Sequence, residues 1–510
     1  MDINQKKSAT TEFGGPLYRS LKKYGDSDYY AFHMPGHKRQ LGLFENPYQI
    51  DITEIDGFDD LHHPEADGIL VRAEERAAKV YGAEETHFLV NGSTAGILSA
   101  VSGCTSRGGK ILMARNCHRS VYHGVELRAL HPVYLYPQQL EKLGINGAIL
   151  PEDVEKALEK ERDIQAVIIT SPTYDGVCSD VRHIAEICHR FEKPLLVDQA
   201  HGAHFPFSEY FPEDALRAGA DLVIHSVHKT LPSMTQTALL HMQGNLADRE
   251  QVRRYLSVYQ SSSPSYVLMA SIDACMELLE QDGKELFAEH ERELRAFRES
   301  CRELRLLYLA GADSETGGKW QEKKKQTEFG PGADFDRSKL LISAGRAGIS
   351  GGRLSELLRE RYHLQMEMSG PDYVVAIAGI ADTKEGFDRL RDALLELDQE
   401  LAEGREIIEK TETEKRNFGG YRLPGLPLRL TPGEAWERES TLCALEDSVD
   451  RTAGTYVYLY PPGIPVLTPG EQVTRELTEE LRDWMEQGFQ VHGLESHGGS
   501  RALLRILREE

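Results

Sequence analysis

The stretch DLVIHSVHKT, residues 221–230, decides the fold that we predict for this chain. Its apolar first half is typical of a buried strand, and its polar second half is typical of a site at the strand's carboxyl end. A second apolar run, KPLLVD at residues 193–198, lies upstream and also ends in a charged residue. Together they indicate that Asp198 and Lys229 lie at the ends of two buried strands.

A carboxylate and a lysine on two such strands suggest a site for pyridoxal 5'-phosphate (PLP). In this interpretation Lys229 holds the cofactor as a Schiff base, and Asp198 pairs with the pyridinium nitrogen. An adjacent carboxylate keeps that nitrogen protonated, so that the ring accepts the electron pair left at a substrate's α-carbon. Burial beside His228 would lower the pKa of Lys229 and make its amine a nucleophile.

A phosphate site is suggested by THFLVNGSTAGI, residues 86–97. The pattern predicts a short strand, a turn of small residues and an apolar helix, whose first N–H groups suit an anion. Ser93 and Thr94 could add hydroxyl donors. The alternative is plain N-capping of the helix by one of these side chains.

Strands alternate with helices across residues 86–242, which predicts a mostly parallel sheet covered on both faces. Ligands collect at the carboxyl ends of the strands in such sheets, where Ser93, His118, Asp198 and Lys229 are all expected. His118 follows the strand predicted at 110–115 and could stack on a flat ring. This agreement supports the site more than any single residue does.

The composition limits the class of protein and the kinds of partner that we expect. The chain has 510 residues, 40% hydrophobic and 28% charged, as in ordinary globular proteins of two or three domains. Its net charge of −23 disfavours nucleic acid and anionic membranes as partners and suits a cationic substrate. The seven cysteines show no pairing pattern, which favours reduced thiols and a cytoplasmic location. The sequence contains no run of about 20 apolar residues, which is the length needed to span a bilayer.

We divide the chain into an N-terminal surface arm (1–65), a large cofactor-binding domain (66–305), an exposed loop (306–336), a small α/β domain (337–405) and a C-terminal domain (406–510). Helices are predicted at 68–81 and 283–305, the second after a hydroxyl-rich turn at 260–266 and an apolar helix. The quartet TPGE occurs at 431–434 and 468–471 and has the form of a capping box. Glu471 is therefore equally well explained as a helix cap.

Seven motifs in order resemble the bacterial Orn/Lys/Arg decarboxylases, in a subgroup without an N-terminal wing domain. They are PGHK (35–38), DDLH (59–62), NGSTAG (91–96), DxAHG (198–202), SxHK (226–229), SSPSY (262–266) and YPPGIP (460–465). The resemblance implies a PLP enzyme with the aspartate aminotransferase fold: a large domain with a mostly parallel seven-stranded sheet, plus smaller C-terminal α/β domains.

The resemblance also implies roles for single residues. Lys229 and Asp198 keep the roles given above, and His118 would stack on the ring. The other cofactor contacts implied are Ser93, Thr94, Ser226 and His228 at the phosphate, Ala200 and His201 after Asp198, and Ser261 or Ser262 from the adjacent subunit, where Gln260 replaces a hydroxyl residue. Glu471 would lie near the distal cationic group of the substrate.

The implied reaction is α-decarboxylation of arginine, lysine or ornithine to agmatine, cadaverine or putrescine, within polyamine metabolism, by a homodimer or larger homo-oligomer. A PLP aminotransferase or another lyase of the same fold would share Lys229 and Asp198, with Arg346 or Arg353 holding the α-carboxylate. A metal hydrolase using Asp198, His201 and His204 leaves Lys229 unexplained, and an inactive binding protein leaves every ionisable residue unexplained.

Overall fold

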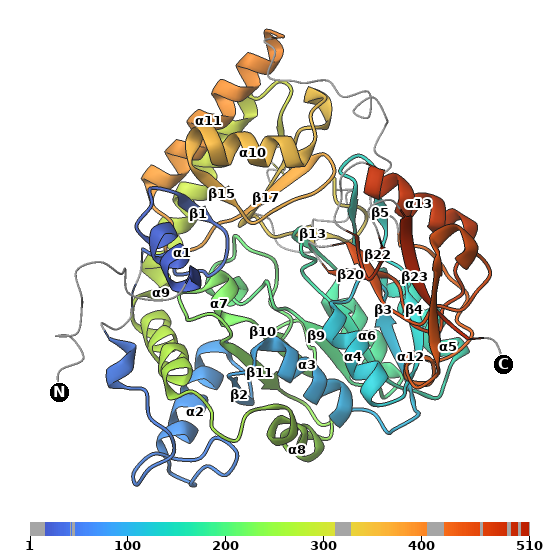
Figure 1. The fold of residues 1–510 in the computed structure, drawn as a ribbon. Helices are drawn as coiled ribbons and strands as arrows, with labels where there is room; N and C mark the ends of the chain where they lie inside the picture. The colour runs from blue at the N-terminus through green and yellow to red at the C-terminus, as the bar shows by residue number, and fades with distance from the viewer. Residues whose placement is uncertain are drawn as a thin grey trace, which may run out of the picture.

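The computed structural model (Figure 1) describes residues 16–40, 42, 46–311, 328–404, 423–459, 463–486, 491–497 and 501–508. Expectations for residues 1–15, 312–327, 405–422 and 460–462 lie outside the described residues. The large domain occupies the lower part of Figure 1, the small domain lies above it, and the C-terminal region lies at the right.

A seven-stranded sheet in the order β2-β11-β10-β9-β7-β3-β4 forms the centre of the large domain. Six strands share one direction, and β11 is antiparallel to both neighbours, β10 and β2. The predicted fold class, a mostly parallel sheet, is therefore confirmed. The strands are β2 (Glu85–Leu89), β3 (Lys110–Ala114), β4 (His131–Leu135), β7 (Ile164–Thr170), β9 (Leu195–Asp198), β10 (Leu222–His225) and β11 (Ala238–Met242).

The helices of the large domain precede, connect or follow these strands in the sequence. Helix α3 approaches the sheet closely at Gly96, where an added Cβ would lie 2.6 Å from Leu89 Cδ1. It packs against α4 and α8, while α5 packs against α6. The helices are α2 (Ile69–Tyr81), α3 (Gly92–Gly103), α4 (Arg119–Leu127), α5 (Pro151–Lys160), α6 (Val181–Arg190), α7 (Val227–Thr230) and α8 (Arg249–Tyr259).

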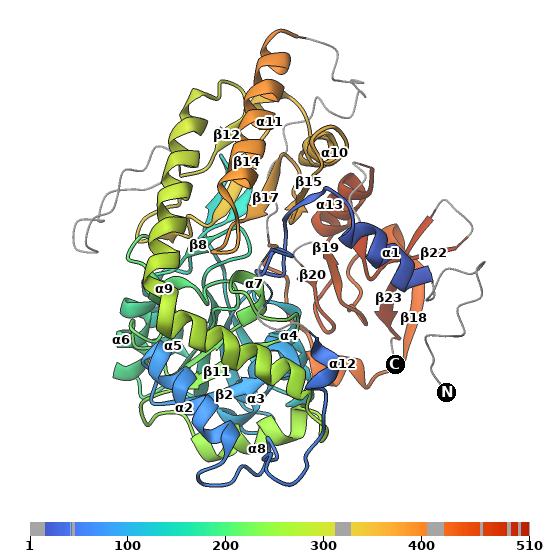
Figure 2. The same cartoon turned by 90° about the vertical axis from the view of Figure 1, so that its left-hand side faces the viewer.

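One long helix, α9 (Tyr266–Ser300), runs from the large domain to the small domain (Figure 2). We predicted two helices here, the second beginning at Gly283, and that prediction is wrong. Gly283 is buried in the middle of a continuous 35-residue helix. A glycine costs a helix interior only about 1 kcal/mol, which the packing of a long apolar face outweighs.

The small domain has the predicted order of strand, helix, strand, helix. Its four-stranded antiparallel sheet has the order β12-β14-β17-β16. Its elements are β12 (Tyr308–Leu309), β14 (Lys339–Ser343), α10 (Gly351–Tyr362), β15 (Leu364–Met366), β16 (Met368–Ser369), β17 (Tyr373–Ile377) and α11 (Lys384–Ala402).

The exposed loop predicted at 306–336 needs correction at both ends. Strand β12 joins the small sheet, and β13 (Asp334–Phe335) pairs with β8 (Val177–Cys178). Phe329 and Phe335 are buried and stack with their ring centroids 4.1 Å apart. The low apolar content of the whole segment concealed these few buried residues. The five-part division of the chain otherwise stays a prediction.

The N-terminal arm is also less exposed than we predicted. Helix α1 (Pro16–Gly25) precedes β1 (Tyr30–Phe32), which is fully buried and pairs in parallel with β15. The Gly36 N–H donates to the His228 carbonyl at 2.7 Å. A Cβ on Gly36 would lie 2.6 Å from the Leu231 carbonyl oxygen, so only glycine allows this approach. The arm thus contacts both α7 and the small domain.

The C-terminal region has two three-stranded sheets, β18-β23-β22 and β20-β19-β21, around an apolar core of its own. Helix α12 packs on α4 of the large domain. The elements are α12 (Pro432–Trp436), β18 (Ser440–Ala444), β19 (Val457–Leu459), β20 (Ile464–Leu467), α13 (Arg475–Glu486), β21 (Val491–His492), β22 (Glu495–His497) and β23 (Arg501–Leu507).

All seven cysteines are free thiols. Across the described ranges, no helix combines the length and the apolar character that crossing a bilayer requires.

Candidate active site

Lys229 lies in the short helix α7, directly after β10, as predicted. Its Nζ is 3.1 Å from His201 Nε2, in the turn that follows β9. Burial lowers the pKa of Lys229, while the carboxylates of Asp198 and Glu367 oppose that shift. A lowered pKa favours the free amine, which is the form that can attack a carbonyl group.

Asp198 ends β9 and is electrostatically coupled to Lys229. It is 3% exposed, and burial raises its pKa while the Lys229 ammonium opposes the shift. Its Oδ1 accepts a 3.2 Å bond from the Ala200 N–H. A buried carboxylate with so few donors is suited to a cationic N–H partner, because an opposite charge compensates its desolvation.

The start of α3 offers an anion site. Its N-cap residue, Asn91, makes no side-chain cap, since its Nδ2 donates to the Tyr259 carbonyl at 3.2 Å. Ser93 Oγ lies 2.5 Å from Ser226 Oγ, at the start of α7. The alternative that Ser93 or Thr94 simply caps α3 is therefore wrong. The Ser93 and Ser226 hydroxyls instead join the starts of α3 and α7.

His118 caps α4 and is fixed by Ser120, whose N–H donates to His118 Nδ1 at 3.3 Å. Burial and the Lys229 charge lower the pKa of His118 to about 3, so its ring is neutral. His228 Nδ1 donates to the Thr237 carbonyl at 2.8 Å, and burial lowers its pKa to about 4. Both rings are thus held in one orientation.

The hydroxyl-rich turn adjoins the start of α3 through Gln260, and its serines lie at the surface. Ser261 and Ser262 are exposed, and the Ser261 carbonyl accepts a bond from His62 Nε2 at 2.8 Å. Gln260 is buried and binds β2, because its Oε1 accepts from the Val90 N–H at 2.8 Å. The side chain that replaces a hydroxyl residue therefore points inward, and the serines that follow it face outward.

Glu471 does not face the Lys229 cluster with a free carboxylate. It is fully buried and forms a 3.3 Å ion pair with Arg115, at the end of β3. Its Oε2 also accepts from the Thr468 N–H at 2.7 Å. Helix α13 begins only at Arg475, so Thr468 does not cap a helix. Thr431 and Glu434 do form a capping box, at α12.

The three residues of the metal-site alternative have separate partners. His201 lies between two lysine amines, and His204 Nε2 bonds to Asp336 Oδ1 at 3.1 Å. In the part of the chain that the structure describes, no three His, Cys, Asp or Glu side chains are placed to hold a metal ion. The alternative is therefore unsupported by geometry.

The two arginines of the aminotransferase alternative have partners elsewhere. The Arg346 guanidinium lies 5.2 Å from the centroid of the Tyr308 ring, and Arg353 pairs with Glu356 on its own helix. Neither of these contacts belongs to the Lys229 cluster.

Two residues that sequence reasoning missed, Lys339 and Glu367, also belong to the site. Lys339, at the start of β14, has its Nζ 2.7 Å from His201 Nδ1. Glu367 accepts from the Tyr174 hydroxyl and, at 2.9 Å, from the Met34 N–H of the arm. The sequence does show that Lys339 is a charged residue at the start of an apolar run. It does not show that His201, its partner, lies 138 positions away.

The residues present fit PLP. Four features belong to this site: a buried carboxylate, a lysine amine, a neutral imidazole, and the start of α3, which has no side-chain cap and carries a pair of hydroxyls. Each matches one part of the cofactor: the ring nitrogen, the aldehyde, the ring face and the phosphate.

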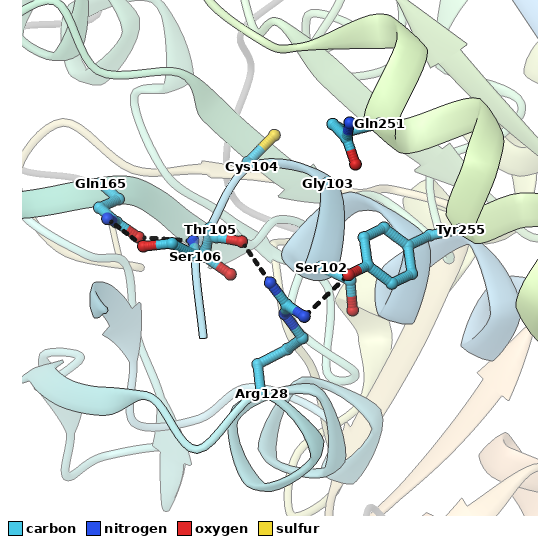
Figure 3. Close-up of a pocket in the computed structure, with 9 residues that line it drawn as sticks. All are labelled: Ser102, Gly103, Cys104, Thr105, Ser106, Arg128, Gln165, Gln251 and Tyr255. Atoms are coloured by element: carbon cyan, nitrogen blue, oxygen red, sulfur yellow. Dashed lines mark hydrogen bonds between the residues drawn. The ribbon is translucent and has the colours of Figure 1, made fainter. Parts of the chain in front are cut away.

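A separate open pocket of about 500 Å³ lies at the other end of α3 (Figure 3). Arg128 crosses it, donating to the Tyr255 hydroxyl at 2.7 Å and to the Thr105 carbonyl at 2.9 Å. The other lining residues are Ser102, Gly103, Cys104, Ser106, Gln165 and Gln251. This pocket is at the amino ends of β3 and β7, away from Lys229.

Comparison with known proteins agrees with this geometry. Residues 15–313 match the family described as "Orn/Lys/Arg decarboxylase, major domain", and residues 428–497 match its C-terminal domain. An arginine decarboxylase of Bacillus subtilis is 31% identical over 97% of this chain and 98% of its own length. The lysine decarboxylase LdcA of Pseudomonas aeruginosa is 24% identical over 95% of this chain and 78% of its own.

Solved structures confirm the predicted fold. The lysine decarboxylase LdcF of Francisella novicida superposes with a TM-score of 0.76 at 22% identity, covering 97% of this chain and 81% of that one. An alanine–glyoxylate aminotransferase of Nostoc sp. gives a TM-score of 0.54 at 14% identity, covering 78% and 100%. The major-domain match spans the large domain and includes Ser93, His118, Asp198 and Lys229, whereas Lys339 and Glu367 lie outside both matched ranges. The chain belongs to the Orn/Lys/Arg decarboxylase family.

Proposed function

We propose that this protein is a PLP-dependent decarboxylase that converts a basic amino acid, with arginine preferred, into the corresponding amine and CO2. The proposal rests on one observation: Lys229 and Asp198 are buried, interact electrostatically, and belong to the same site as the start of α3, which has no side-chain cap. The preference for arginine is supported by full-length relatives named arginine decarboxylase at 30–32% identity.

Each residue of the site has a task in this reaction. Lys229 would bind the cofactor covalently, Asp198 would hold a proton at its ring nitrogen, and His118 would cover one ring face. Ser93, Thr94, Ser226 and His228 would hold the phosphate, with Ala200 and His201 as further contacts. When bound, PLP supplies a ring that accepts the electron pair left when CO2 departs.

The site offers carboxylates to a cationic substrate. Glu367 is half-buried and electrostatically coupled to Lys229, whereas Glu471 is committed to Arg115. We therefore propose Glu367, rather than Glu471, as the carboxylate closer to the substrate. Arginine's guanidinium can bind a carboxylate through two parallel N–H groups, which lysine and ornithine cannot do.

We propose that the enzyme acts as a homodimer or larger homo-oligomer in the cytoplasm. The exposed hydroxyls of Ser261 and Ser262 support this, because they are accessible to the phosphate site of a neighbouring subunit. Seven free thiols are typical of a reducing compartment. Agmatine, the product from arginine, would place the reaction in polyamine metabolism.

The test begins with an absorbance spectrum of the purified protein before and after borohydride, followed by peptide mapping. We expect near-visible absorbance that borohydride abolishes, and a label on the peptide that contains Lys229. Arginine, lysine and ornithine are then supplied separately, and CO2 and amine are measured without any keto acid. Turnover that requires a keto acid would favour the aminotransferase instead.

A further inference from the structure

We propose that His225 is a positioning residue that fixes Asp198 relative to Lys229, a role that rests on the proposed function. His225 is the last residue of β10 and directly precedes Ser226, at the start of α7. Its Nε2 lies 2.8 Å from Oε1 of Gln199, the residue that directly follows β9. This contact therefore joins the two strand ends that carry the two central groups of the site.

The neighbouring contacts determine which atom donates in this hydrogen bond. The Ala215 N–H donates to Gln199 Oε1 at 3.1 Å, so this oxygen is an acceptor and His225 Nε2 carries the hydrogen. The same Nε2 lies 3.3 Å from Oδ2 of Asp214. One N–H thus faces two acceptor oxygens, and residues 214–215 contact both of the side chains that meet here.

The contact extends the connection between the two strands beyond their backbone pairing. That pairing ends at Asp198 and Ile224, and one further backbone bond follows, from the Gln199 N–H to the Ile224 carbonyl at 3.0 Å. His225 is 0% exposed, and Gln199 and Asp214 are each 1% exposed. Because a buried donor or acceptor without a partner costs free energy, the depth of the contact favours one fixed arrangement.

Gln199 also holds the turn that carries Asp198 and His201. Its carbonyl accepts from the Gly202 N–H at 2.8 Å, and Asp198 Oδ1 accepts from the Ala200 N–H at 3.2 Å. The turn is tightly packed, because a Cβ on Gly202 would lie 2.6 Å from Gln199 Cγ. A displacement of the Gln199 side chain would therefore move the backbone that positions Asp198.

The relative position of the two groups matters for the chemistry proposed above. Lys229 and Asp198 would act on two different atoms of one rigid ring, the aldehyde carbon and the ring nitrogen. The ring cannot adapt to an error in their separation, and a misplacement of about 1 Å can cost on the order of 100-fold in rate. Loss of the His225 contact should therefore change cofactor orientation and turnover more than substrate affinity.

His241, on β11, provides a matched control. It is also 0% exposed, and the centroid of its ring lies 5.0 Å from that of His225 and 4.6 Å from that of Tyr81. Its Nδ1 lies 2.8 Å from Thr86 Oγ1, on β2, so its hydrogen bond does not involve the turn after Asp198. His241→Phe thus removes an equally buried imidazole without removing the contact between the two strand ends.

The test uses PLP-loaded protein and two readouts. Near-visible circular dichroism, normalised to bound cofactor, reports cofactor orientation, and steady-state kinetics with arginine, lysine and ornithine separate kcat from KM. His225→Phe should lose most of the dichroism, and its kcat should fall roughly 10–100-fold with KM nearly unchanged. His225→Gln should restore both readouts, because a glutamine amide N–H can replace the donor at Nε2. His241→Phe should lower the unfolding temperature and change neither readout.

Gln199→Leu removes the acceptor instead of the donor and is an independent variant should His225→Phe not fold. It should show the same losses, and adding His225→Phe to it should cause little further loss, because both changes break one contact. Unaltered dichroism and kcat in the folded variants, or an equal loss in His241→Phe, would overturn the positioning role. An unaltered protein that binds no PLP, or that releases no CO2 from any of the three amino acids, would instead overturn the proposed function, and the positioning role with it.

Discussion

Arg115 and Glu471 form an ion pair of 3.3 Å between two side chains that are both fully buried. Burial alone would lower the pKa of Arg115, but the Glu471 carboxylate outweighs it and raises that pKa. Arg115 also donates to the Val466 carbonyl at 3.3 Å and to the Tyr122 hydroxyl at 2.8 Å. The pair therefore joins the C-terminal region to the end of β3, three residues before His118.

Replacing Glu471 by Gln should destabilise the protein by about 3–5 kcal/mol, because it leaves a buried guanidinium without its counter-charge. Urea unfolding measures this loss. Glu434→Gln is the matched control: it alters the same position of the other TPGE quartet, where the carboxylate is exposed and caps α12, and should cost about 1 kcal/mol. A Glu471→Gln protein of unaltered stability with only a raised KM would restore the substrate-binding role.

Replacing Asp198 by Asn should reduce kcat by about 1,000-fold, equivalent to ~4 kcal/mol of lost transition-state stabilisation. Without cofactor, the same variant should be more stable than the unaltered protein at neutral pH. Burial raises the folded-state pKa of Asp198, so its ionisation opposes folding once the pH exceeds the unfolded value. Thermal unfolding of the cofactor-free protein at pH 4 and pH 7 checks the sign.

Removing a phosphate hydroxyl should weaken PLP binding without affecting pyridoxal. Ser93→Ala and Ser226→Ala should each raise the Kd for PLP about tenfold, or about 1.4 kcal/mol, through a lost hydrogen bond to a charged group. Because pyridoxal lacks the phosphate, it serves as the control ligand in the same titration. An equal loss for both ligands would mean that the serines act on the fold instead.

His87 should make the stability of the protein depend on alkaline pH. Burial alone would lower its pKa, but Glu74 and Glu85 outweigh burial and raise it to about 9. The stabilisation is therefore complete below the unfolded value near 6.5 and is lost as the pH rises to about 9. His87→Gln should cost on the order of 2 kcal/mol at pH 6 and much less at pH 10.

Urea unfolding at both pH values measures the difference for His87→Gln. His131→Gln is the control, since His131 is an exposed histidine on β4. A cost for His87→Gln that is equal at pH 6 and pH 10 would count against the ion-pair explanation.

Gly36→Ala should displace the arm from α7, because the new Cβ would lie 2.6 Å from a backbone oxygen that cannot move aside. We expect a loss of about 1–3 kcal/mol in stability and faster proteolysis of the arm. Gly25→Ala, at the end of α1, has no neighbouring atom within 4 Å and should change neither. Equal behaviour of the two variants would show that the arm does not need this close approach.

Local patterns predicted much of this structure from the sequence. The strands that end at Asp198 and Ala114 and the helix that starts at Gly92 are encoded by short apolar runs and turns, which fix both type and direction. Because parallel strands place their carboxyl ends at one edge, His118, Asp198 and Lys229 could be assigned to one site in advance.

The remaining features depend on contacts between distant segments. Nothing local distinguishes Glu434, which completes a capping box, from Glu471, which is paired with Arg115 356 positions away. Lys339 reaches His201 only because the small domain folds back over the site. Gly283 is a weak helix breaker whose local cost is exceeded by packing that the sequence does not display.

The arm connects the small domain to the large domain, because β1 pairs in parallel with β15 and the Gly36 N–H donates to the His228 carbonyl. A rotation that separated the small domain from α7 would have to break either the β1–β15 pairing or the Gly36–His228 hydrogen bond. The arm would therefore limit such a rotation, and a change in residues 30–36 should alter the rate at which substrate enters and product departs.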